Sequence, residues 1–111
     1  MTAHVEYLWW AECPSHEEGY RLLGAALAAE GLDLPISSIE VRSEAEAERL
    51  VFVGSPTFRV NGRDLDLMPP PTGMARPYGM TCRVYRREDG RFAPLPTLDW
   101  LRAALRRAVA E

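Results

Sequence analysis

The amino-terminal third of the chain constrains the fold most, because a helical pattern separates two strand-length runs. His4–Trp10 is a short run of aromatic and branched residues, a helical pattern extends from Pro14 to Gly31, and residues 36–42 form a second strand-length run. Two consecutive strands joined by a helix pair in parallel, through a right-handed crossover. The first strand is apolar on both sides apart from Glu6, which predicts helices on both faces of the sheet.

The middle of the chain continues the alternation with a helix and a strand. Ser43, with Glu46 three residues later, forms a capping box and opens a second helix that runs to about Val51. Thr57–Val60 has the composition of a third strand and runs into the turn Asn61–Gly62. A short helix followed by a strand is therefore expected between residues 43 and 60.

The last part supplies one more strand and helix beyond an irregular segment. Residues 63–80 are predicted to form a loop, Thr81–Arg86 a fourth strand, and Thr97 the cap of a final helix with leucines at helical spacing. The third and fourth strands can form a hairpin if the loop extends outward. The sequence thus predicts a single α/β domain over residues 1–111, in the order β-α-β-α-β-β-α, with a four-stranded mixed sheet and helices on both faces.

Composition and charge exclude several classes of partner. The net charge is -3 and the two signs are interspersed, so neither nucleic acid nor an anionic membrane is an expected partner. No stretch approaches the roughly 18 apolar residues of a membrane span, and the start lacks the pattern of a signal peptide, so a cytoplasmic location is expected. The chain has no lysine, which excludes Schiff-base chemistry, and its 13 basic residues are all arginine, as is typical of a GC-rich bacterial genome.

Two segments carry a resemblance to a known family. Residues 5–16, V-E-Y-L-W-W-A-E-C-P-S-H, place a cysteine between a hydrophobic strand and a helix, and residues 54–57, G-S-P-T, lead into the third strand. With the element order, these segments resemble the thioredoxin superfamily, and in particular its small bacterial thioredoxin-like members. The resemblance implies that Cys13 is the reactive cysteine and that Pro56 is cis and faces it. Where the family has its second cysteine this chain has His16, so a two-cysteine cycle within the motif is impossible.

The predicted catalytic residues are Cys13 and His16. A thiol attacks as the thiolate, and the unpaired N–H groups and dipole at a helix amino terminus favour that form. His16 lies one helical turn further on, where imidazolium can stabilise the thiolate or imidazole can accept the thiol proton. The alternatives are an inert thiol at the start of the helix and a solvated histidine.

The predicted substrate-binding residues surround Cys13. Because the family's third strand is antiparallel to the first, Pro56 is expected beside Cys13, and an extended thiol substrate can pair with the exposed backbone next to it. Pro14 fits the first helical position, and an ordinary trans proline is the alternative for Pro56. The full predicted set is Trp10, Pro14, Ser55, Pro56 and Thr57.

Cys82 and three methionines leave a second chemistry open. Cys82 is expected at the opposite end of the sheet from Cys13, on the order of 15 Å away, whereas a disulfide needs Cα atoms within about 7 Å. A buried structural thiol is therefore the preferred interpretation of Cys82. Met68, Met74 and Met80 are soft ligands suited to Cu(I), but packing in a lid over a substrate groove is preferred, and no metal or cofactor is expected.

The leading functional hypothesis is a monothiol thiol–disulfide oxidoreductase in which Cys13 attacks a disulfide and an external thiol resolves the adduct. Its partner would be a thiol- or disulfide-bearing protein or a glutathione-like small thiol. The alternative is a non-catalytic thioredoxin-like module that binds a partner or a soft metal, Cu(I) or Hg(II), in a grouping with alkylmercury lyases. The sequence leaves the oligomeric state open.

Overall fold

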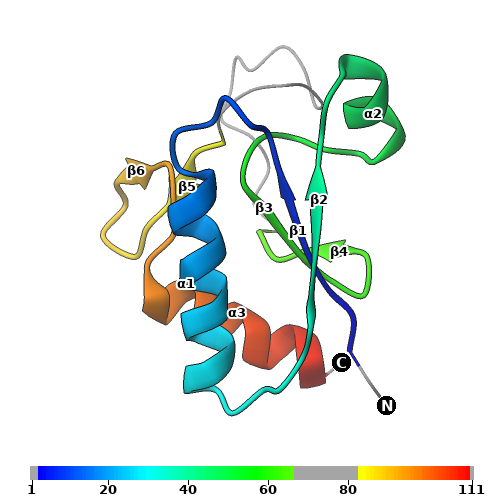
Figure 1. Ribbon diagram of the computed structural model, residues 1–111. Helices are drawn as coiled ribbons and strands as arrows, with labels where there is room; N and C mark the ends of the chain where they lie inside the picture. Colours follow the sequence, from blue (N-terminus) through cyan, green and yellow to red (C-terminus); the bar gives the residue numbers. More distant parts are fainter. Residues whose placement is uncertain (1–2, 67–82, 111) are drawn as a thin grey trace.

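A mixed four-stranded sheet with the order β2-β1-β3-β4 forms the centre of the computed structural model, which describes residues 3–66 and 83–110 (Figure 1). The elements in chain order are β1 (Val5–Trp9), α1 (His16–Ala29), β2 (Ile36–Glu40), α2 (Glu44–Arg49), β3 (Thr57–Val60), β4 (Arg63–Asp64), β5 (Tyr85–Arg86), β6 (Phe92–Ala93) and α3 (Leu98–Ala110). Strand β1 pairs in parallel with β2 and antiparallel with β3. The predicted α/β class and mixed four-stranded sheet are therefore confirmed.

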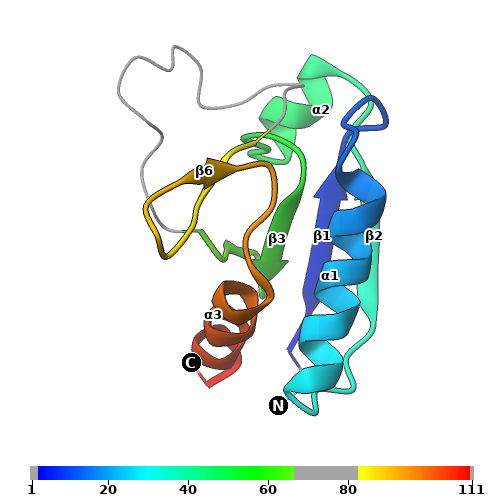
Figure 2. The same cartoon turned by 90° about the vertical axis from the view of Figure 1, so that its left-hand side faces the viewer.

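Side-chain alternation along β1 directs apolar groups to both faces of the sheet. Val5 and Tyr7 pack in a core cluster with Leu23 of α1 and Leu101 of α3, whereas Leu8 packs in a second cluster against α2. Helices α1 and α3 contact each other and lie together on one side of the sheet (Figure 2). The sheet thus has helices on both faces, as its first strand predicts.

Helix ends follow the capping signals in the sequence. Gly31, with a φ of 67°, ends α1, and the next N–H, that of Leu32, donates to the carbonyl of Leu27 in a Schellman arrangement. Ser43 Oγ accepts from the N–H of Glu46 at the start of α2, so the predicted cap is confirmed. None of the helices in the described residues combines the length and the hydropathy that a membrane crossing requires.

The fourth strand of the sheet is not the predicted one. Asn61 and Gly62 both have positive φ, so they form a tight turn that brings β4 directly against β3. Strand β4 lies in the segment predicted to be a loop, and the part of the predicted Thr81–Arg86 strand that the structure describes, β5, pairs with β6 in a separate two-stranded sheet. The sequence prediction was wrong here because a two-residue turn favours immediate pairing over a long connection.

Candidate functional site

Cys13 lies in the loop between β1 and α1, two residues before the helix cap. Its carbonyl accepts from the N–H of His16 at 3.3 Å, which closes a turn with Pro14 and Ser15 at its centre. A proline presets the backbone angle for the second position of such a turn. Pro14 is therefore a turn residue, and the prediction that it occupies the first helical position is wrong: α1 begins at His16 with Ser15 as its cap.

The sulfur of Cys13 points to the segment that precedes β3. Cys13 Sγ donates to the carbonyl oxygen of Ser55 at 3.5 Å, and the Ser55–Pro56 peptide is cis. The neighbouring N–H of Trp10 donates to Ser55 Oγ at 3.0 Å, while the side chain of Trp10 packs against the α2 cluster. The structure thus brings Cys13, Ser55 and Pro56 together, as the resemblance implies.

The thiol of Cys13 is buried, with a residue exposure of only 2%. Its bond to a carbonyl oxygen can be made only by the protonated form, because a thiolate has no hydrogen to donate. In this conformation the sulfur is therefore a covered thiol, and an exposed thiolate requires that the bond to Ser55 be broken.

The imidazole of His16 stacks on the indole of Trp9, with ring centroids 4.6 Å apart and planes at 15°. Trp9 in turn donates from Nε1 to Ser38 Oγ. Both rings line a pocket of about 350 Å³ whose walls are Tyr7, Trp9, His16, Glu17, Tyr20, Arg21 and Ser38. Among the described contacts, the only one that joins His16 to Cys13 is the backbone hydrogen bond, so an acid–base role for His16 gains no support.

Tyr7 of β1 contacts the first turn of α1. Its hydroxyl donates to the carbonyl of His16. Burial, with a smaller contribution from Cys13, raises the pKa of Tyr7 far above its usual range. Tyr7 is thus a neutral donor that fixes the first turn of α1 over the sheet.

The predicted substrate-binding residues Ser55, Pro56 and Thr57 are all buried. The Ser55 carbonyl accepts from the N–H of Arg83 at 2.9 Å as well as from the Cys13 thiol, and the Pro56 carbonyl accepts from the Tyr85 hydroxyl. The expectation of exposed backbone beside Pro56 is therefore wrong, because the chain itself occupies these acceptors.

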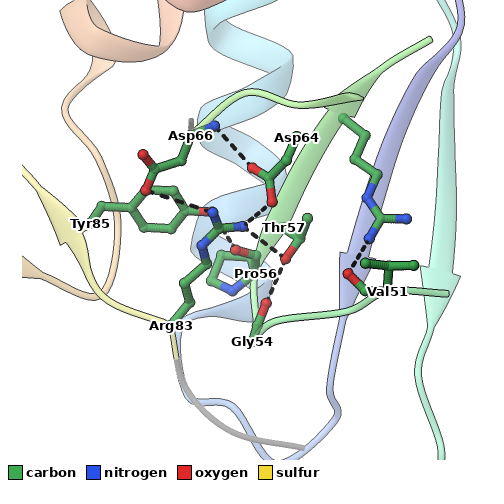
Figure 3. A network of polar contacts seen from close by, with 9 residues as sticks. Val51, Gly54, Pro56, Thr57, Asp64, Asp66, Arg83 and Tyr85 are labelled. Carbon is green, nitrogen blue, oxygen red and sulfur yellow. Dashed lines mark hydrogen bonds and ion pairs between the residues drawn. The ribbon is translucent and has the colours of Figure 1, made fainter. Parts of the chain in front are cut away.

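Arg83 stands at the centre of a polar network beside this segment (Figure 3). Its guanidinium lies 2.7 Å from Asp64 Oδ2 and 3.6 Å from Asp66 Oδ2, donates to Thr57 Oγ1 at 3.1 Å, and lies 4.9 Å from the centroid of the Tyr85 ring. Burial alone would lower the pKa of Arg83, but Tyr85 and the two carboxylates outweigh burial, and the net pKa is raised. The network holds a cation whose side chain is only 10% exposed.

Sequence reasoning missed this network. The turn signal Asn61–Gly62, with Asp64 two residues after it, favours a hairpin that carries an acidic side chain next to β3. Nothing in the sequence distinguishes Arg83 from the other arginines, because Asp64, which accepts its shortest hydrogen bond, lies 19 residues away along the chain, and Thr57 lies 26 away.

The chain matches no protein-family model, and no curated protein or solved structure matches it. Within residues 3–66 and 83–110, no group of three or more His, Cys, Asp or Glu side chains is placed to hold a metal ion. The hypotheses about Cys82, Met68, Met74 and Met80 lie outside the described residues. What the site does must be inferred from the geometry around Cys13.

Proposed function

We propose that the chain has a thioredoxin-like fold and that Cys13 performs thiol–disulfide exchange as a monothiol. Three features support the fold assignment: the parallel β1–β2 pair joined by α1, the antiparallel β1–β3 pair, and a cis proline at the start of β3. The order β1-α1-β2-α2-β3-β4 also agrees with this fold, although β4 lies earlier in the chain than the fourth strand that the sequence predicts.

One observation carries the functional proposal: the Cys13 sulfur contacts the carbonyl of the residue that precedes the cis proline. A thiol in the loop between β1 and α1, next to a fixed turn of backbone, is well placed to attack a disulfide presented at that loop once its bond to Ser55 opens. Cys13 loses its proton and attacks one sulfur of a disulfide R–S–S–R, so a Cys13–S–S–R bond forms and R–S⁻ leaves and takes up a proton. An external thiol R′–SH then loses its proton and attacks the R sulfur of the mixed disulfide. The disulfide R–S–S–R′ forms, and the Cys13 sulfur leaves and takes up a proton.

A second candidate is favoured by the burial of the thiol. A cysteine that is 2% exposed and has its S–H satisfied by a carbonyl behaves as a small structural hydrophobe. The chain would then be a non-catalytic thioredoxin-like module that binds a partner through another surface, without redox chemistry at Cys13.

Catalytic turnover separates these candidates. The Cys82→Ser variant, which retains Cys13 as its single cysteine, is added to a small glutathione mixed disulfide with glutathione in excess, and release of the small thiol is followed over time. The exchange proposal predicts a rate that rises in proportion to protein concentration and that disappears in Cys13→Ser. A rate equal to the uncatalysed one for Cys82→Ser at every protein concentration supports the non-catalytic module.

A further inference from the structure

The main chain at Arg83 lies directly against Gly54 and Ser55. The Arg83 N–H donates to the Ser55 carbonyl at 2.9 Å. A Cβ added to Gly54 would lie 3.0 Å from the Cβ of Arg83 and 3.2 Å from its Cα and N, and Gly54 has a φ of 142°. Gly54 thus lets a second stretch of backbone approach the residue that precedes the cis peptide.

The side chain of Arg83 anchors this approach. Asp64 and Asp66 supply two carboxylates, and Tyr85 supplies the face of its ring, so the guanidinium has charged and aromatic partners on several sides (Figure 3). The hydroxyl of Tyr85 also donates to the Pro56 carbonyl, two residues after Gly54. Displacement of the Arg83 main chain from Ser55 therefore strains contacts that involve a buried cation.

An extended peptide that adds as a strand needs free main-chain donors and acceptors at the edge it joins. At Ser55 the carbonyl already accepts from Arg83 on one side and from the Cys13 thiol on the other. A small disulfide makes no such demand, because it needs access only to the sulfur and not to the Ser55 main chain.

Resting on the exchange reaction proposed above, we infer that Arg83 is a specificity-determining residue, which reserves Cys13 for low-molecular-weight disulfides and disfavours extended peptide disulfides. The reaction at sulfur is the one already written, with the incoming disulfide as the oxidant. Arg83 takes no part in bond exchange. It acts by keeping its own N–H on the Ser55 carbonyl.

The test compares two probes in variants that carry the Cys82→Ser change. One probe is glutathione disulfide, and the other is an extended peptide whose single cysteine is blocked as a mixed disulfide with glutathione. Mass spectrometry gives the rate at which each probe modifies Cys13, and the readout is the ratio of the peptide rate to the glutathione disulfide rate. A variant that only loosens the fold raises both rates and leaves this ratio unchanged.

Asp64→Asn is the main variant, because it removes one charge from the anchor while an amide oxygen can still accept from the N–H of Asp66. Arg83→Ala removes the anchor altogether. Arg102→Met is the matched control: it removes another arginine–carboxylate pair, to Glu30 at the far end of α1, about 20 Å along the helix from its first residue.

The inference predicts that the ratio rises about tenfold in Asp64→Asn, and more in Arg83→Ala if that variant folds, while Arg102→Met stays within about twofold of the parent. If glutathione disulfide modifies Cys13 but the ratio in Asp64→Asn equals that of the parent, Arg83 is a stabilising contact only and the inference is wrong. If neither probe modifies Cys13 in any folded variant, the exchange function itself fails and the inference fails with it.

Discussion

Two flanks hold the Ser55–Pro56 segment, and they differ in strength. The β1–α1 loop contacts it through the N–H of Trp10 and the long S–H contact from Cys13. The opposite flank, around Arg83 and Tyr85, contacts it through an N–H and a phenol hydroxyl. The guanidinium of Arg83 donates to the next residue, Thr57, and is itself held by two carboxylates.

The difference indicates which side separates first. Sulfur is a weak hydrogen-bond donor, whereas a hydrogen bond between charged groups is roughly twice as strong as a neutral one. The flank that carries Cys13 should therefore open at the smaller cost, which frees the sulfur while the Arg83 flank keeps the cis segment in place. The five predictions below test how firmly each flank holds the segment.

Removal of the Arg83 guanidinium should have the largest effect. Arg83→Met leaves the Asp64 and Asp66 carboxylates without their shared cation, and breaking such a buried arrangement from one side costs about 3 kcal/mol of unfolding free energy. Urea denaturation measures the loss. The control Arg102→Met should lose less than about 1 kcal/mol, since Arg102 is 36% exposed and Glu30 keeps its contact with Arg106. Equal losses in the two variants would mean that the Arg83 ion pairs stabilise the protein no more than the Arg102–Glu30 pair.

Helix α1 should tolerate no side chain where it contacts the cis segment. A Cβ on Gly19 would collide with the hydroxyl of Tyr7 and lie 3.2 Å from Cγ of Pro56, so Gly19→Ala should lose about 2 kcal/mol through overpacking. Gly24→Ala in the same helix meets nothing within 4 Å and should gain about 0.5 to 1 kcal/mol from helix propensity. Thermal denaturation of both variants tests the contrast, and a stabilised Gly19→Ala would show that this contact is loose.

The hydroxyl of Tyr85 should contribute a smaller amount. Tyr85→Phe removes the donor to the buried Pro56 carbonyl and should cost about 1 kcal/mol at neutral pH, measured by urea denaturation. A variant as stable as the parent would mean that the hydroxyl does not help to hold the segment.

The same phenol predicts a pH dependence. Burial raises the pKa of Tyr85 far above the unfolded value of 10.0. A raised folded pKa means that the stability is complete below pH 10 and falls as the unfolded chain gives up its proton at higher pH. Between pH 10 and 11 each such tyrosine should remove about 1 kcal/mol, and this decline should be smaller in Tyr85→Phe by the contribution of one group. Identical slopes for the two proteins would contradict the burial of this hydroxyl.

The Cys13 flank should show the smallest effect on stability. Cys13→Ser retains a donor of similar size toward the Ser55 carbonyl, so the unfolding free energy should change by less than about 1 kcal/mol. Urea denaturation beside Arg83→Met gives the comparison directly. A loss larger than that of Arg83→Met would reverse the order of the two flanks.

Local signals in the sequence were sufficient for much of the fold. Gly31 ends α1 and Ser43 caps α2 because these features depend on residues only a few positions apart. The placement of Cys13 beside the Ser55–Pro56 segment was implied by the resemblance, because the family's antiparallel first and third strands bring the start of the third strand to the end of the first.

Features that depend on long-range packing were not predictable. Helix α1 begins two residues later than predicted because Pro14 belongs to the turn that follows Cys13. The imidazole of His16 stacks on the indole of Trp9 and does not contact the Cys13 sulfur in the described contacts. The pairing of the Arg83 main chain with Ser55 depends on a contact across 28 positions, which no local pattern encodes.

Modification of the folded wild-type chain by glutathione disulfide, mapped by peptide mass spectrometry, tests whether Cys13 is a reactive thiol in the native protein. If Cys13 performs exchange, the mixed disulfide forms on Cys13 under conditions where circular dichroism shows the native fold. Modification of Cys13 only in denaturant, with the folded protein either unmodified or modified at Cys82 alone, would contradict the exchange proposal.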